Sequence, residues 1–147
     1  MRARVTRVVD GDTFEARLEG EVVDVRMIGI DAPESVHPTE PVECFGAEAS
    51  AFTEQRLEHS PVHLEFDVER IDTFGRTLAY VWKGRRLFNE DMVRMGYATL
   101  ATYPPNVAYV QRLVEAERKA RRDGLGLWDA CLVPINTGAD WRELGDA

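Results

Sequence analysis

Charged side chains gather in one stretch that runs from a strand into a turn. In the segment RMIGIDAPE, Arg26 lies five residues before Asp31 and eight before Glu34. Carboxylate oxygens bind hard cations, and the planar guanidinium group of arginine binds phosphate oxygens through two parallel hydrogen bonds. These residue types at this spacing therefore predict the edge of a site that can hold a cation and a phosphate together.

Two further stretches carry residues of the same kinds, the DGDT segment at 10–13 and the DTFGR segment at 72–76. Each alone has an ordinary explanation, because Asp-Gly is typical of a hairpin turn and Phe-Gly-Arg of a turn with a surface arginine. All three stretches lie at strand ends or turns. Their joint pattern is more specific than any one of them.

The elements that must position these stretches follow from the spacing of apolar residues. β-Branched and apolar residues predict strands over 3–9, 13–18 and 22–30, and strict alternation predicts a fourth strand over 62–68. A fifth strand is expected over 76–82. The first three strands then form a meander, with the DGDT segment at its first turn.

Helices are expected over 46–58, 89–95 and 106–124, with Asn89 and Asn106 as caps of the last two. The predicted elements follow one another as a three-stranded meander, a helix between the third and fourth strands, and two helices after the fifth strand. This order predicts an α+β fold, a five-stranded OB-fold-type Greek-key β-barrel with three helices, although several small folds share it.

Length and composition are those of one globular domain. The 147 residues are 44% hydrophobic and 30% charged, and we place the domain at 1–133, followed by an irregular tail at 134–147. We expect 35–43 to be an exposed, mobile loop beside the site. No apolar run approaches the length of a membrane span, and we expect no signal peptide in the given chain.

The formal charge of −8 argues against a simple nucleic-acid binder, which usually carries a basic face. The objection weakens if the acidic groups hold a divalent cation, because the cation reverses the local field. It weakens further if the 16 arginines among the 18 basic residues gather on one side.

The two cysteines, Cys44 and Cys131, fit neither a zinc-site spacing nor a redox CxxC pair. Two possibilities remain open from the residues alone, a single disulfide or two buried reduced thiols. A disulfide would tie the loop before the first helix to the end of the chain.

Five segments occur in an order that resembles the staphylococcal-nuclease-like (thermonuclease) family: DGDT at 10–13, RMIGIDAPE at 26–34, FGAEA at 45–49, FGRTLAY at 74–80 and NEDMV at 89–93. The resemblance runs from about Val5 to Trp128. The family's fold is an OB barrel with three helices, which agrees with the element order above. The resemblance implies a calcium-dependent endonuclease that cuts single-stranded or fraying DNA and RNA at the P–O5′ bond and leaves 3′-phosphates.

The same resemblance assigns roles to individual residues. It implies a Ca²⁺ site formed by three carboxylates and one backbone carbonyl: Asp12, Asp31, Glu34 and the carbonyl of Ala32. Arg26 and Arg76 match the two catalytic arginines. Glu34 is expected either to activate the attacking water as a general base or to position it through the metal shell.

The chain departs from the family pattern beside the second arginine. Phe74 stands where a tyrosine is common and Thr73 where a lysine is common, so phosphate contacts are lost and weaker substrate affinity is expected. Phe74 can still stack on a base. Tyr103 matches the family's stacking tyrosine only across a one-residue gap, which leaves a base contact and a plain surface or core aromatic both open.

An alternative function is a catalytically inactive OB-fold nucleic-acid-binding module of the same family. Its signature would be a lost carboxylate or arginine, and none is lost here. We expect a monomer with DNA and RNA as substrates and no membrane or obligate protein partner. The family's secretory habit favours a secreted or cell-envelope location and, with it, a Cys44–Cys131 disulfide.

Overall fold

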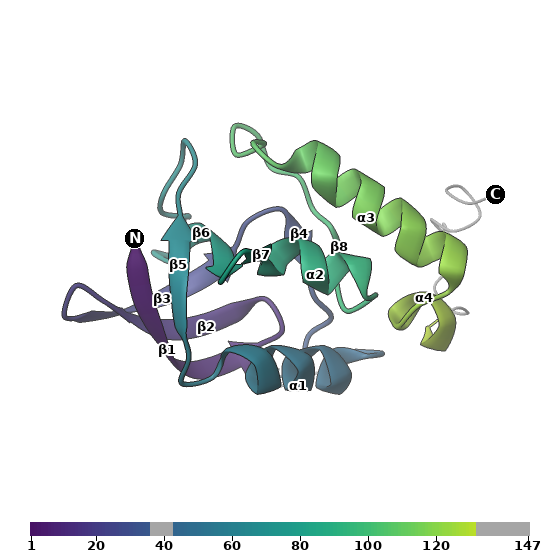
Figure 1. Cartoon of the computed structure of the whole chain (residues 1–147), viewed down its shortest axis with the longest axis horizontal. Coiled ribbons are helices and arrows are strands. Elements are labelled where there is room, and N and C mark those ends of the chain that lie inside the picture. Colours follow the sequence, from purple (N-terminus) through teal and green to yellow (C-terminus); the bar gives the residue numbers. More distant parts are fainter. Residues whose placement is uncertain (36–42, 132–147) are drawn as a thin grey trace.

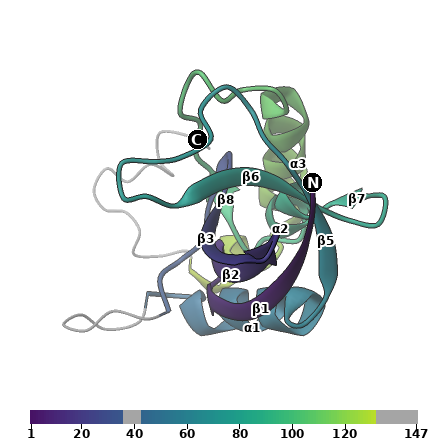
Figure 2. The ribbon, with the colours of Figure 1, turned by 90° about the vertical axis from the view of Figure 1, so that its left-hand side faces the viewer.

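The computed structural model describes residues 1–35 and 43–131, in which the central strands curl into a closed five-stranded barrel (Figures 1 and 2). Around the barrel the strands follow the order β3-β2-β1-β5-β6, and β6 returns to pair with β3. The barrel strands are β1 (Arg2–Asp10), β2 (Thr13–Leu18), β3 (Glu21–Met27), β5 (Pro61–Glu65) and β6 (Thr77–Lys83). The predicted α+β barrel of OB type is thus confirmed.

Alternating side chains fill the barrel. Successive residues of a strand point to opposite faces, so the apolar member of each pair enters the core while the charged member stays outside. Val5, Phe14 and Val25 are completely buried, whereas their neighbours Arg4 and Asp24 are exposed. Charge is therefore confined to the outer face of the barrel and to its turns.

The barrel closes through a short parallel contact between β3 and β6. Val25, Arg26 and Met27 lie opposite Thr77, Leu78 and Ala79, respectively. All the other barrel pairs are antiparallel. Two short pairs extend the arrangement: β7 (Arg86–Leu87) pairs with β6, and β4 (Ile30–Asp31) pairs with β8 (Thr99–Leu100).

Three substantial helices and one short one accompany the barrel: α1 (Gly46–Leu57), α2 (Phe88–Arg94), α3 (Val110–Asp123) and α4 (Leu127–Ala130). In Figure 1, α1 runs beneath the barrel while α3 and α4 lie to one side of it. Gly124 adopts the left-handed conformation that ends α3, as expected of a glycine C-cap. None of the described helices is long and apolar enough to span a membrane.

Two predicted strands are shorter in the structure. The strand expected over 22–30 is interrupted after Met27, where Gly29 has a φ of 85° and turns the chain into β4. The strand expected over 62–68 ends at Glu65. There the Asp67 carboxylate accepts hydrogen bonds from the Val68 amide and the Tyr80 hydroxyl, which shapes a turn.

The two asparagines predicted as helix caps have another role. α2 begins at Phe88 and α3 at Val110, so neither Asn89 nor Asn106 is a cap. Asn106 instead accepts a hydrogen bond from the Glu69 amide at 2.8 Å and donates one to the Glu69 carbonyl at 2.9 Å. These two hydrogen bonds join the segment before α3 to the segment after β5.

Asn89 links three elements in the same manner. Its side chain accepts a hydrogen bond from the Val81 amide and donates one to the Ile28 carbonyl, both at 2.8 Å, and it is completely buried.

Two predicted segments lie outside the described residues. They are most of the loop expected at 35–43, of which residues 36–42 are not described, and the whole tail expected at 134–147.

We predict that Asn89→Ala lowers the free energy of unfolding by about 2–5 kcal/mol, because it leaves a buried amide and a buried carbonyl without partners. Urea denaturation followed by circular dichroism measures the change. The exposed Gln55→Ala on α1 is the control and should change stability little. Equal stability of the two variants would contradict the role given to Asn89.

Candidate active site

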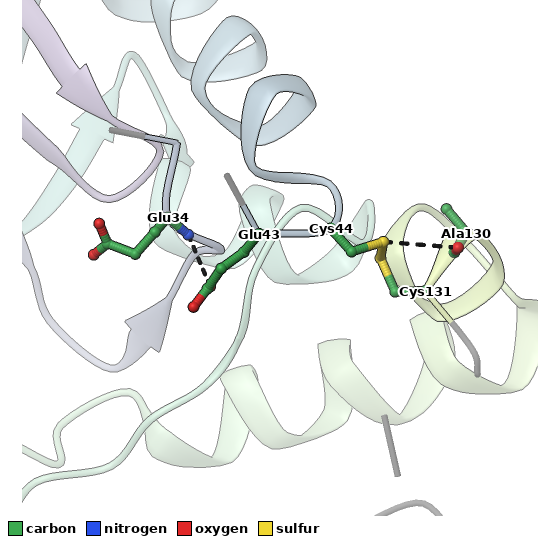
Figure 3. The surroundings of a disulfide bond; sticks show 5 residues. All are labelled: Glu34, Glu43, Cys44, Ala130 and Cys131. Carbon is green, nitrogen blue, oxygen red and sulfur yellow. Dashed lines mark hydrogen bonds between the residues drawn. A yellow bond between two sulfur atoms is a disulfide. The ribbon is translucent and has the colours of Figure 1, made fainter. Parts of the chain in front are cut away.

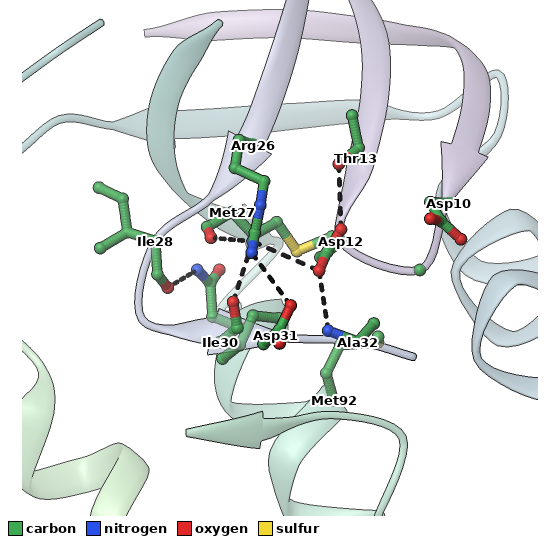
Figure 4. Close-up of polar contacts among 12 residues, drawn as sticks. Asp10, Asp12, Thr13, Arg26, Met27, Ile28, Ile30, Asp31, Ala32 and Met92 are labelled. Carbon is green, nitrogen blue, oxygen red and sulfur yellow. Dashed lines mark hydrogen bonds and ion pairs between the residues drawn. The ribbon is translucent and has the colours of Figure 1, made fainter. Parts of the chain in front are cut away.

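Arg26 is the centre of a dense polar cluster at the end of β3 (Figure 4). Its Nη1 donates hydrogen bonds to the carbonyls of Met27 and Ile30, each at 2.9 Å. Its guanidinium also forms two ion pairs, Nη1 with Asp12 Oδ2 and Nη2 with Asp31 Oδ1, both at 3.4 Å. The first arginine and the first two carboxylates predicted from the sequence are therefore in contact.

The Arg26 guanidinium is fixed by several oxygen partners and still has N–H donors that can bind a ligand. Its side chain is 16% exposed, and a guanidinium so covered needs several oxygen partners. Of the five N–H groups of an arginine, those on Nη1 face the two carbonyls and one on Nη2 faces Asp31. Nε and the other Nη2 hydrogen have no hydrogen-bond partner in the described part of the chain and can receive a phosphate.

Asp12 is placed by the first hairpin. Its Oδ2 accepts a hydrogen bond from the Ala32 amide at 2.8 Å, and its Oδ1 accepts one from the Thr13 hydroxyl at 3.0 Å. The preceding Gly11 leaves room for this approach, because a Cβ there would lie 2.8 Å from the Ala32 Cβ. From α1, the buried Thr53 hydroxyl donates to the Gly11 carbonyl at 2.7 Å and anchors the turn.

Asp31 lies in a field of excess negative charge. Partial burial raises the pKa of the Asp31 carboxyl, and the nearby Asp12 carboxylate raises it further, while Arg26 lowers it. Glu43 and Asp10 add smaller contributions in the same upward direction. A cation placed among these groups would relieve that repulsion.

Glu34 is exposed and its backbone is tied on both sides. The Glu34 amide donates to Glu43 Oε1 at 2.9 Å, and the Glu43 amide donates back to the Glu34 carbonyl at 3.1 Å. The next residue, Ser35, donates hydrogen bonds to the buried Asp10 carboxylate from its amide and its hydroxyl. Asp10 thus supports the segment that follows Glu34, and Glu43 is an additional support without a sequence signature.

A complete metal cage is not assembled in the described residues. No group of three or more His, Cys, Asp or Glu side chains there is placed to hold a metal ion. Asp12 and Asp31 share Arg26, and the oxygen chemistry of this pair suits a hard cation. The assignment of Glu34 and the Ala32 carbonyl as further ligands stays a prediction.

Arg76 enters the same region from the start of β6. Its Nε donates to Asp72 Oδ2 at 2.7 Å, and its Nη groups have no carboxylate partner in 1–35 and 43–131. Asp72 is itself fixed, since its Oδ1 accepts hydrogen bonds from the Phe74 and Arg76 amides at 2.9 Å. Partial burial acts to raise the pKa of the Asp72 carboxyl, but the hydrogen bonds from Arg76 and Phe74 outweigh burial, so this pKa is lowered.

One pocket of about 600 Å³ unites the predicted arginines and aromatic residues. Arg26, Arg76, Phe74 and Tyr103 all line it. Phe74 and Tyr103 are 81% and 72% exposed, so Tyr103 is a surface aromatic at the pocket rather than a core residue. Two arginines and two open aromatic faces in one pocket can bind a phosphate and stack on a flat ring.

Arg70 also lines this pocket and was not predicted from the sequence. Its guanidinium lies 4.1 Å from the centre of the Phe66 ring. No ion pair of Arg70 occurs within the described ranges, whereas Arg26 and Arg76 each face aspartates. Only its position two residues before Asp72 could have drawn attention to it.

The cysteines form the disulfide that the residues alone left open and the family resemblance favoured. Cys44 and Cys131 are bonded, with a Cα–Cα distance of 5.9 Å, and join the start of α1 to the end of α4 (Figure 3). Cys44 follows Glu43 directly, while the Glu34 carboxylate points away from the disulfide in this view. The disulfide therefore connects Glu43, which hydrogen-bonds the Glu34 backbone, to the end of α4.

Comparison with known proteins gives a consistent result. A family model described as staphylococcal nuclease homologue matches residues 24–130, which include Arg26, Asp31 and Arg76. The chain is 42% identical over 125 residues to the thermonucleases of Staphylococcus hyicus and Staphylococcus intermedius, which covers 85% of this chain and 74% of each relative. It is 32% identical over 134 residues to the endonuclease YncB of Bacillus subtilis (strain 168), covering 90% of this chain and 64% of that protein.

Because Asp72 holds Arg76 through its charged form, we predict that Asp72→Asn destabilises the protein by about 1–3 kcal/mol at neutral pH. The lowered pKa means that the stabilisation is complete above the unfolded-state pKa of about 3.9 and is lost as the pH falls through the lower folded-state pKa. Urea denaturation between neutral and acid pH measures this. The exposed Asp24→Asn is the control, and a difference that persists in acid would contradict the account.

Proposed function

The chain belongs to the staphylococcal nuclease family, and we propose that it is a calcium-dependent endonuclease of single-stranded or fraying DNA and RNA. In this proposal it hydrolyses the P–O5′ bond and leaves 3′-phosphates. Relatives named as thermonucleases and endonucleases support nuclease activity on nucleic acids.

The observation that carries the proposal is the shared pocket of Arg26 and Arg76. A phosphodiester in this pocket would meet one guanidinium held beside two carboxylates and another held by Asp72. Such preorganised donors stabilise charge that develops on the phosphate oxygens in the transition state. Bidentate geometry explains why arginine rather than lysine stands at both positions.

Calcium fits the donor set beside Arg26. Asp12 and Asp31 supply carboxylate oxygens, and Ca²⁺ accepts oxygen ligands in loose geometry. Partial burial and, after it, the neighbouring Asp12 carboxylate raise the pKa of Asp31, and a bound cation would favour its ionised form. Glu34 and the Ala32 carbonyl are the further ligands that we propose. When bound, the cation would polarise the phosphate and lower the negative potential that otherwise repels a polyanion.

Glu34 is the residue proposed to activate or orient the attacking water. Its exposed carboxylate can reach solvent, and Glu43 and Ser35 hold its backbone at both ends. A general base needs this combination of a fixed main chain and an accessible oxygen.

Phe74 and Tyr103 are the proposed base-contacting residues. Both rings are open to solvent at the pocket that contains the two arginines. Stacking on an aromatic face tolerates any base, which suits an enzyme that cuts both DNA and RNA. An unpaired strand is preferred because stacked and paired bases cannot reach these rings.

The Cys44–Cys131 disulfide supports a secreted or cell-envelope location, because disulfides persist in oxidising compartments. We further propose that the protein acts as a monomer and needs no obligate protein partner.

The direct test is cleavage of end-labelled single-stranded DNA and RNA with calcium and with a chelator. We expect cutting only with calcium and products that carry 3′-phosphates, which phosphatase treatment identifies. Binding without any cutting would instead support the inactive nucleic-acid-binding module. Cutting that continues in chelator would exclude the calcium requirement.

We predict that Arg76→Lys lowers the rate of cleavage by about 10²–10³-fold, because lysine keeps the charge but loses the planar pair of donors. Glu34→Gln should cause a loss of similar order if its carboxylate acts on water. Single-turnover rates at saturating substrate measure both effects. Arg85→Lys, at the exposed β6–β7 turn, is the matched control. Full activity of either site variant would remove its assigned role.

Calcium should also stabilise the protein by about 2.7 kcal/mol when its concentration is 100 times the dissociation constant. We predict that Asp31→Asn abolishes most of this gain. In chelator the same variant should be as stable as the parent or more so, because the substitution removes a carboxylate whose pKa is raised by partial burial and by the Asp12 carboxylate, so that its ionised form is disfavoured. Thermal unfolding with and without calcium measures both effects. Asp129→Asn on α4 should keep the full gain, and an unchanged gain in Asp31→Asn would contradict the ligand assignment.

A further inference from the structure

A second groove lies on the outer face of the barrel, near the far ends of the strands that carry the candidate active site. It has a volume of about 790 Å³, and its lining includes Arg2, Arg4, Arg17, His63 and Trp82. Glu19 is the one carboxylate among its described lining residues. The groove is therefore basic on a chain whose formal charge is −8.

The strand register places these residues in two neighbouring rows across the sheet. Arg17 on β2 lies opposite Arg4 on β1, Arg2 lies opposite His63 on β5, and His63 lies opposite Trp82 on β6. The two arginines of the first pair are exposed, since the alternating residues beside them point into the core. Like charges directly opposite each other on a sheet destabilise it, so folding gives no reason for this pair.

The charge of these arginines is not neutralised by carboxylates. Arg4 Nη1 donates to the His59 carbonyl at 2.8 Å, and Arg17 Nη1 contacts the Gly20 carbonyl at 3.4 Å. Such neutral partners orient a guanidinium and leave its charge available. Within the described ranges, eight other arginines form ion pairs with carboxylates, whereas the three of the groove form none.

The groove lies within reach of a strand bound at the candidate active site. Thr13, at the start of β2, pairs with Arg26, and Arg17 is four residues further along the same outer face. At about 3.3 Å per residue this separation is roughly 13 Å along the strand. Consecutive phosphates of one nucleic-acid strand advance by about 3.4 Å in a duplex, so a few more nucleotides cover it.

We propose that this groove is a second binding surface for the phosphates of the nucleic-acid strand whose cleavage is proposed above. The inference rests on that proposed function and adds where the rest of the substrate binds. Arg4 and Arg17 bind the backbone, and Trp82 forms an apolar wall beside them. The surface offsets the phosphate contacts that Phe74 and Thr73 do not supply at the pocket.

The test is the double variant Arg4→Gln/Arg17→Gln, which keeps the length and polarity of both side chains and removes two charges. Binding to a long fluorescent single-stranded oligonucleotide is measured in chelator, where no cutting is expected, as a function of salt. Loss of two phosphate contacts should weaken binding roughly 10- to 30-fold near 0.1 M salt and reduce the slope of log K against log salt by about 1.4. The cleavage rate for a dinucleotide substrate should stay unchanged.

The matched control is Arg118→Gln/Arg122→Gln on α3, which removes the same charge from another exposed surface. It should change the affinity and the salt slope much less. Equal effects of the two double variants, or no effect of the groove variant, would overturn the proposal while leaving cleavage by the parent protein as separate support for the nuclease function. Weaker binding to anionic lipid vesicles with unchanged binding to the oligonucleotide would overturn it as well.

Discussion

The parallel pairing of β3 with β6 is the contact on which the rest of the arrangement depends. It involves only three residue pairs, yet it closes the barrel and sets Arg26 opposite Leu78. Arg76 precedes Leu78 by two residues and so lies on the same outer face. A parallel pair needs a long crossover, which here contains α1 and β5. Since Thr53 of α1 also anchors the hairpin turn before Asp12, the crossover that allows closure fixes the carboxylate side of the site too.

Confining charge to the outer face gives this small protein its candidate functional surfaces. The interior accepts only the apolar half of each strand, so arginines and carboxylates meet at turns and on the outside of the barrel. Around Arg26 and Arg76 the opposite charges hold each other in place. In the groove of Arg4 and Arg17 neither arginine forms an ion pair with a carboxylate of the described residues, so a basic groove occurs on a chain whose net charge is −8.

The sequence predicted the elements whose signals are local. Alternation and β-branched residues identified the barrel strands, and the family resemblance grouped Asp12 with Arg26 and Asp31. Asn89 and Asn106 were predicted to be helix caps because asparagine is a good cap. Their side chains instead hydrogen-bond backbone groups 61 and 37 residues away, respectively, and such distant contacts leave no local pattern in the sequence. Glu43, Thr53, Arg70 and the Arg4–Arg17 pair were missed for the same reason, since strand register and chain crossing bring them into place. The disulfide needed the fold to choose between two open possibilities.

The central claim is that Arg26 and Arg76 act as a unit on one phosphate. A double-mutant cycle tests it most directly, with single-turnover cleavage rates for Arg26→Lys, Arg76→Lys and the double variant. Residues that act together are strongly non-additive, so the double variant should be little slower than the slower single variant. Losses that multiply fully would contradict the account, because they would mean that the two arginines stabilise the reaction independently.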